Sequence, residues 1–218
     1  MGCPIDDRRH ATATAARRTA LARALRAVCL LLGCGLFVLP SARALQLHGV
    51  QIPTQQVVGT QTLQCNGAGT RWILFFKIYV AGLYLPRPAR SASQALAMAG
   101  PKQMRLVMLR DVSGKELVQH MESDLKANLS SRQLAPFKPA LERLRSAFMA
   151  RHDLPSGAVI DMRELPAGGL EVLINGEPLG APLRQAGLFD AVLRAWLGSN
   201  PADARLKRAL LGDTSASG

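Results

Sequence analysis

The strongest constraint on the fold of this chain is a strand-forming segment over residues 60–86. It has the sequence TQTLQCNGAGTRWILFFKIYVAGLYLP. Gly67 and Gly69 predict a turn or a bulge. The run that follows, from Trp72 to Leu85, is β-branched and aromatic, and it is too often interrupted by glycine for a helix. We therefore expect a long bent strand or a hairpin here, and a fold that contains a β-sheet.

The N-terminal residues have the order of a secretory signal peptide. Six arginines precede an apolar run over residues 27–40, and the small-x-small sequence ARA follows at residues 42–44. The apolar run spans about 14 residues, whereas a membrane-spanning helix needs about 20. We predict a signal peptide over residues 1–44, a single domain over residues 45–218, a periplasmic location and no integral membrane span after cleavage. The alternatives are a twin-arginine signal and a lipoprotein processed at Cys34.

Removing these residues changes what the composition implies. The remaining chain has 20 basic and 13 acidic residues, so its net charge is +7 where the whole chain has +12. The basic residues are spread through every segment, which argues against a nucleic-acid partner. Only Cys65 remains of four cysteines, so no intramolecular disulfide can form. The histidines are too widely spaced for a metal site, and no dinucleotide loop or serine-nucleophile motif is present, so no cofactor is expected.

Other segments alternate between strand and helix patterns. Ser113 and Glu116 have the spacing of a capping box at the start of one helix. Most expected strands are joined by short turns, which is typical of an α+β domain with an antiparallel sheet and helices against one face. The expected elements are an edge strand or hairpin over 46–58 broken at Pro53, strands over 104–110, 158–164 and 170–175, and helices over 91–99, 113–125, 134–148, 183–197 and 202–211.

Arg71, directly after the glycines, is the first candidate for a binding residue. On one straight strand, Arg71, Lys77 and Tyr79 would share a face, and the opposite face would belong to the core. That opposite set is Trp72, Leu74, Phe76, Ile78 and Val80. Two cations and a phenol among apolar side chains are typical of a cleft for an amphiphilic anion, although both cations could instead pair with surface carboxylates. Arg71 and Tyr79 would be about 26 Å apart on a straight strand, so both contact one ligand only if the strand bends.

Several blocks of the sequence resemble the chalcone isomerase-like proteins, and particularly their exported bacterial branch. In the order of that family they are GAGTRWILFFKIYVAGLYLP, MRLVMLRDVSGKEL, EVLINGEPLG, and FDAVLRAWLG followed by LKRALLG. The resemblance covers residues 45–212. It implies an open-faced β-sandwich, in which a layer of helices covers a large antiparallel sheet and the ligand cleft lies between them.

The resemblance also implies a role for Arg71, because an arginine after the glycines steadies the substrate phenolate in the plant isomerases. The other positions of that set depart from the isomerase pattern. Tyr79 replaces a threonine, Leu117 a tyrosine, Asp124 an asparagine, and Ala195-Trp196 a Thr-Met pair. The hydroxyl and amide donors that orient a flavonoid are therefore missing, which argues against flavonoid cyclisation.

Other members of the superfamily resemble fatty-acid-binding proteins, in which an arginine and a tyrosine hold a carboxylate. Our leading hypothesis is a non-catalytic periplasmic protein that binds a small amphiphilic acid, such as a fatty acid. The expected ligand-binding residues are Arg71 as ion partner, Tyr79 as hydrogen-bond donor, Lys77, and the apolar Leu117 and Trp196. One alternative is an isomerase or lyase acting on an unknown enone, with Arg71 for the enolate and Tyr79 as acid. The other is a structural or partner-binding envelope protein, with Arg71 in a buried salt bridge.

Overall fold

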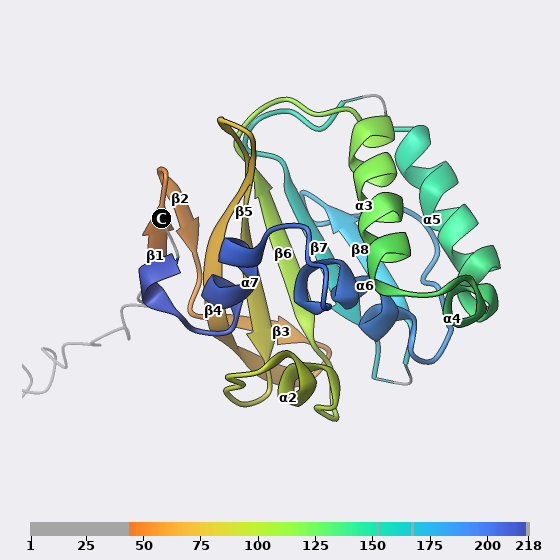
Figure 1. Cartoon of the computed structure of the whole chain (residues 1–218), viewed down its shortest axis with the longest axis horizontal. Helices are drawn as coiled ribbons and strands as arrows, with labels where there is room; N and C mark the ends of the chain where they lie inside the picture. The colour runs from red at the N-terminus through yellow and green to blue at the C-terminus, as the bar shows by residue number, and fades with distance from the viewer. Residues whose placement is uncertain (1–43, 152, 167, 217–218) are drawn as a thin grey trace, which may run out of the picture. The chain divides into compact units, whose positions relative to one another are not determined.

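The computed structural model describes residues 44–151, 153–166 and 168–216 (Figure 1). Apart from Ala44, the expected signal peptide and the alternative lipoprotein residue Cys34 lie outside these ranges. None of the helices in the described part is long and apolar enough to cross a membrane.

A seven-stranded sheet forms the centre of the described part, and every pair of neighbouring strands is antiparallel. Its strands, in spatial and chain order, are β3 (Gln55–Val58), β4 (Gln61–Ile73), β5 (Phe76–Leu85), β6 (Gln103–Met108), β7 (Val159–Glu164), β8 (Leu170–Ile174) and β9 (Glu177–Pro178). Two more strands, β1 (Leu45–Leu47) and β2 (Val50–Ile52), form a separate hairpin. Pro53 separates this hairpin from β3, as the sequence predicts.

The helices gather on one face of the sheet (Figure 1). They are α2 (Ala92–Leu96), α3 (Gly114–Asn128), α4 (Ser131–Leu134), α5 (Lys138–Met149), α6 (Leu188–Leu197) and α7 (Ala204–Leu210), with short 3-10 helices at Ala135–Phe137 and Thr214–Ala216. The main hydrophobic core lies between them and alternate residues of β5 to β8. An antiparallel sheet covered by helices confirms the expected α+β class.

Two helices differ from their sequence-based expectation. The helix expected over 134–148 is divided by the 3-10 turn Ala135–Phe137, because prolines at 136 and 139 lack the N–H that a continuous helix requires. The helix expected over 183–197 begins only at Leu188. Gly187 before it has a φ of +77°, and Leu183 pairs with Leu170 in a β-bridge.

The capping box of α3 is present as expected, with Ser113 and Glu116 bonded to each other's backbone N–H.

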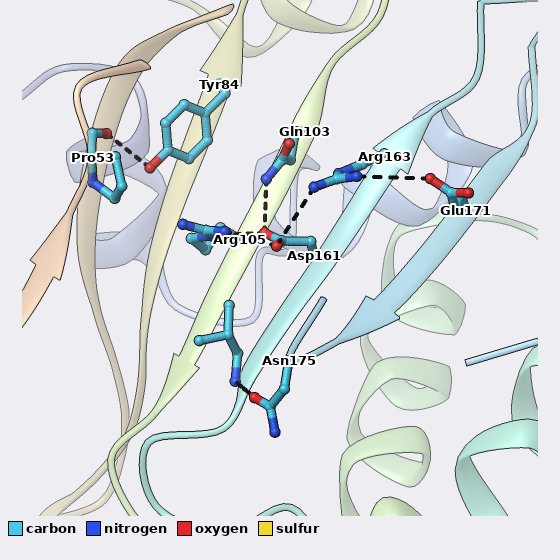
Figure 2. A network of polar contacts seen from close by, with 9 residues as sticks. Pro53, Tyr84, Gln103, Arg105, Asp161, Arg163, Glu171 and Asn175 are labelled. Atoms are coloured by element: carbon cyan, nitrogen blue, oxygen red, sulfur yellow. Dashed lines mark hydrogen bonds and ion pairs between the residues drawn. The ribbon is translucent and has the colours of Figure 1, made fainter. Parts of the chain in front are cut away.

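Polar side chains tie the strands together on the face away from the helices (Figure 2). Arg105 donates two hydrogen bonds of 2.8 Å to Asp161, and Gln103 donates a third of 2.7 Å. The Tyr84 hydroxyl donates to the carbonyl of Pro53 at 2.9 Å. Because Asp161 and Gln103 are buried, these charge-assisted bonds satisfy groups that would otherwise be costly to remove from water. The cation Arg105 on this face is thus engaged within the sheet.

The hairpin of β4 and β5 confirms one of the two forms expected for this segment, a bent strand or a hairpin. It changes the faces that were assigned on the assumption of one straight strand. The chain turns at Leu74 and Phe75, inside the apolar run and beyond the glycines. Strand β5 carries one extra residue, Ile78, because Arg71 pairs with Tyr79 while Trp72 pairs with Lys77. A second bulge falls at Asn66, so the prediction of a bulge near the glycines is confirmed and that of a turn is wrong.

Gly67 and Gly69 lie within β4 because helix α7 packs directly against the strand there. A Cβ atom at Gly67 would lie 2.0 Å from the Ala209 carbonyl oxygen, and one at Gly69 would lie 2.6 Å from the Ala209 side chain. Asn66 in β4 also holds α7 against the strand. Its amide nitrogen donates to the carbonyl oxygens of Leu210 in α7 at 2.7 Å and of Ala89 at 3.0 Å. The glycines therefore set the distance between α7 and the sheet.

We predict that Gly67→Ala lowers the free energy of unfolding by about 2 kcal/mol, because the methyl group must push α7 away from β4. Urea denaturation followed by circular dichroism measures the change. Gly180→Ala is the matched control, since a Cβ there has no atom within 4 Å, and it should change stability by less than about 0.5 kcal/mol. Equal stabilities for the two variants would contradict this account of the contact.

Candidate functional site

A mostly apolar cleft lies between the helix-covered face of the sheet and helices α3 and α6. Its walls include Arg71 and Tyr79 from the hairpin, Leu117, Met121 and Asp124 from α3, and Trp196 from α6. The interior volume that water could occupy is about 50 Å³. That is room for a few water molecules and too little for a long alkyl chain. The cleft is therefore nearly closed in this conformation.

Arg71 is held at one side of the cleft by the segment that leads into α7. Its Nη1 donates to the carbonyl oxygen of Ala202, and also to that of Trp72 at 3.2 Å. Asp203 Oδ2 lies 3.9 Å from the same nitrogen, too far for a hydrogen bond. The Nε and Nη2 donors of Arg71 have no hydrogen-bond partner within the described ranges, so part of the guanidinium fork remains available.

Asp203 has another main contact, because it caps helix α7. Its Oδ1 accepts hydrogen bonds from the backbone N–H groups of Arg205 at 2.8 Å and Leu206 at 3.0 Å. Its Oδ2 accepts one from the Trp72 N–H at 3.3 Å. The carboxylate is thus already satisfied by three N–H donors, and it attracts Arg71 only as a nearby charge.

Tyr79 lies beside Arg71 on the neighbouring strand, because the two residues are paired in the hairpin. The Tyr79 oxygen accepts a 3.0 Å hydrogen bond from Trp196 Nε1. Burial raises the pKa of Tyr79 to about 12, while the positive charge of Arg71 and the bond from Trp196 act in the opposite direction. With its oxygen engaged by Trp196, the hydroxyl proton of Tyr79 is free to be donated into the cleft.

The structure brings together four of the five residues that the sequence singled out. Arg71, Tyr79, Leu117 and Trp196 all line the cleft. Lys77 does not, because the turn and the bulge at Ile78 place it on the other side of the hairpin. There its ammonium donates to His48 Nδ1 at 3.0 Å and lies 5.2 Å from the centre of the Trp72 ring.

Two polar cleft residues were not among the expected ligand-binding set, His120 and Asp124 on α3. Burial raises the pKa of the Asp124 carboxyl, although Arg71 and then His120 lower it. The signal for both was present in the sequence, since positions 117, 120, 121 and 124 fall on one face of a helix. No cluster of histidine, cysteine and acidic residues suited to a metal ion occurs in the part of the chain described here.

Comparison with known proteins identifies the fold. A family model described as chalcone isomerase-like matches residues 44–212. A search of curated proteins finds no significant match. Among solved structures, a fatty-acid binding protein from Arabidopsis thaliana has a TM-score of 0.62 and 18% sequence identity, covering 80% of this chain and 98% of that chain. The match confirms the sandwich of an antiparallel sheet and a helix layer that the sequence predicts.

The burial of Tyr79 gives a direct test of the closed cleft. Burial also raises the pKa of Tyr84, the other of the two tyrosines, so we predict no tyrosinate absorbance in the folded protein near pH 10, where exposed tyrosine is half ionised. Tyr84→Phe should leave one group that titrates at about 12. Because the folded pKa exceeds the unfolded one, the free energy of unfolding should fall as the pH rises above about 10. A tyrosine that titrates near 10 in Tyr84→Phe would contradict the closed cleft.

Proposed function

Because this chain belongs to the chalcone isomerase-like family, we propose that it is a non-catalytic protein that binds a small amphiphilic acid, such as a fatty acid, with Arg71 at the head of the cleft. The observation that carries the proposal is the pairing of Arg71 with Tyr79 at one side of an apolar cavity. A guanidinium with free donors and a phenol with a free proton can together hold a carboxylate. The apolar walls would hold the alkyl chain.

The cleft must widen to accept such a chain, because its interior volume is about 50 Å³ and ligand pockets usually enclose about 300 Å³ or more. Two of its walls are adaptable. Met121 and Met162 are flexible side chains that can change rotamer at low cost, and α3 meets the sheet through side chains rather than backbone bonds. Ligand binding in this proposal displaces these side chains and exchanges the few waters for methylene groups.

The electrostatics of the cleft favour binding over proton transfer. A general acid works best when its pKa lies near the working pH, whereas the pKa of Tyr79 is raised to about 12. Tyr79 therefore keeps its proton at neutral pH and can donate a hydrogen bond without giving the proton up. This supports a binding role over the enone isomerase that the sequence left open.

A structural role for Arg71 is the second candidate, and one observation favours it. The Arg71 Nη1 bond to the Ala202 carbonyl and the 3.9 Å approach of Asp203 tie the hairpin to the start of α7. If Arg71 served mainly to make these contacts, its loss would lower the free energy of unfolding and leave ligand binding unaffected. The two candidates therefore differ in what the same substitution changes.

We expect Arg71→Ala to reduce the affinity for a long-chain fatty acid by at least about tenfold, because a charge-assisted bond to a carboxylate is worth about 1.5–3 kcal/mol. Displacement of a fluorescent fatty acid measures the affinity, and mass spectrometry of the purified protein identifies any acid that it carries. Equal binding by wild type and variant, with no acid carried by either, would overturn the proposal.

Asp203→Asn is the matched control for that experiment. Asparagine is also a good helix N-cap, so α7 keeps its start while the negative charge near Arg71 is lost, together with the acceptor of the long 3.3 Å bond from the Trp72 N–H. In the binding proposal this variant keeps or raises fatty-acid affinity. In the structural alternative, Arg71→Ala would lower the free energy of unfolding through loss of the bond to Ala202, and neither variant would change binding.

Export to the periplasm belongs to the proposal as well. It is supported by the arginine-rich start, the apolar run over residues 27–40 and the ARA sequence at residues 42–44. The domain in this proposal begins at Leu45, next to the start of the family match at residue 44. N-terminal sequencing of the protein from the producing cell tests it, with Leu45 as the expected first residue and a lipid-modified Cys34 as the outcome that would contradict it.

A further inference from the structure

We propose that the tip of the β4–β5 hairpin docks into an anionic lipid surface. The tip is formed by Leu74, Phe75 and Phe76, whose exposed fractions are 83%, 89% and 58%. These are three consecutive large apolar side chains at the end of a hairpin that projects from the sheet (Figure 1). Burying such side chains away from water is strongly favourable, and the fold itself offers them no such burial.

The residues of the turn are not those that a tight hairpin turn favours. Register places only Leu74 and Phe75 in the turn, and Leu74 has a φ of +53°. Two-residue hairpin turns favour asparagine, aspartate and glycine, because these residues adopt positive φ readily and tolerate exposure to solvent. A leucine there is disfavoured both by backbone conformation and by exposure. Such an outlier at an exposed site points to function.

Cations flank the apolar tip. The Arg110 guanidinium lies 5.0 Å from the centre of the Phe76 ring, and the Lys77 ammonium lies 5.2 Å from that of Trp72. Neither cation takes part in an ion pair with the residues that the structure describes. Apolar side chains surrounded by lysine and arginine are typical of segments that lie in the interface of an anionic bilayer.

Two acidic residues, Asp111 and Glu116, line the hollow that Phe76 and Arg110 border, and both have other partners. Asp111 accepts a hydrogen bond from the Ser156 N–H at 2.8 Å. Glu116 accepts bonds from the Ser113 N–H and hydroxyl, both at 2.9 Å. These bonds hold Asp111 in the β6–α3 connection and Glu116 in the first turn of α3. The charges of Arg110 and Lys77 therefore stay without an anionic partner among the described residues.

A bilayer suits this surface better than a folded protein partner. Stable protein interfaces bury more than about 1,000 Å² in total and fit matching surfaces over some 20 residues a side. Three side chains on a narrow hairpin offer far less than that, but they can insert individually between lipid chains. A few inserted side chains and two cations would give reversible, peripheral binding.

Docking at the tip would bring the cleft to the lipid. Ile73, the last residue of β4, and Ile78, the bulged residue of β5, both line the cleft. The same two residues also line a neighbouring hollow bordered by Phe76 and Arg110. The residues next to the tip thus form part of the cleft wall. The inference goes beyond the proposed function, because it concerns a different surface and vesicle binding needs no ligand in the cleft.

The test compares two double variants for binding to phosphatidylcholine vesicles, with and without phosphatidylglycerol, by co-sedimentation. Leu74→Asn with Phe75→Ser, the tip variant, removes the two most exposed of the three tip side chains. Val57→Ser with Met149→Ser removes two exposed apolar side chains elsewhere, whose exposed fractions are 58% and 38%. We expect the tip variant to lose at least about tenfold in affinity for anionic vesicles. The control variant should bind like the wild type, and omitting phosphatidylglycerol should weaken wild-type binding about fivefold for each cation engaged.

Folding is checked in the same samples, and all proteins carry the same N-terminus, confirmed by intact mass. The tip variant should keep or raise its Tm, because asparagine accepts the backbone conformation of Leu74 better than leucine does. Unchanged vesicle binding by the tip variant, or an equal loss in the control, would overturn the proposal. So would tip-dependent self-association without vesicle binding, since the occupant would then be a second copy of the chain.

Discussion

The pairing register of β4 with β5 determines most of what this protein presents to other molecules. Near the tip, a two-residue turn and the bulged residue Ile78 set which side chains face each other. With this register, Arg71 lies beside Tyr79 on the helix-covered side, and Lys77 is carried to the other side beside Trp72. A slip of one residue would exchange the faces of every side chain on one strand. The same hairpin therefore defines both the head of the cleft and the apolar tip.

The cleft combines an apolar interior with a small number of polar groups, and only part of their hydrogen-bonding capacity is used among the described residues. Trp196 satisfies the oxygen of Tyr79, and backbone carbonyls satisfy one nitrogen of Arg71. In the proposed function an anionic ligand accepts from the remaining donors, since buried or half-buried donors are favoured only when they find an acceptor. Asp124 opposes a second negative charge in the cleft, and burial already raises the pKa of its carboxyl. A monoanion with a long apolar body fits this balance better than a polyanion does.

Sequence patterns predicted the α+β class, the helix-covered antiparallel sheet and most of the elements, because alternation and helix periodicity follow from burial on one face. They failed at the β4–β5 turn, where large apolar residues occupy exposed positions. Alternation along one straight strand placed Leu74 and Phe76 on the core face, but both are exposed, because the chain turns at Leu74 and Phe75. That error also assigned Lys77 to the cleft. The closeness of α7 to β4, which explains Gly67 and Gly69, joins segments far apart in the chain, and no local pattern reports such a contact.

The anchoring of Arg71 by the segment before α7 has a consequence for folding kinetics. The hydrogen bond from Arg71 to Ala202 spans 131 residues of chain, and the bond from Asn66 to Leu210 spans 144. Contacts of such high sequence separation close large loops, and proteins that depend on them fold slowly because the entropy of closure precedes the stabilising contact. Local hairpins and helices can form while the C-terminal end is still being synthesised. The head of the cleft, by contrast, acquires its geometry only when α7 packs against β4. A chain that ended before α7 would therefore form the sheet but would not hold Arg71 in place.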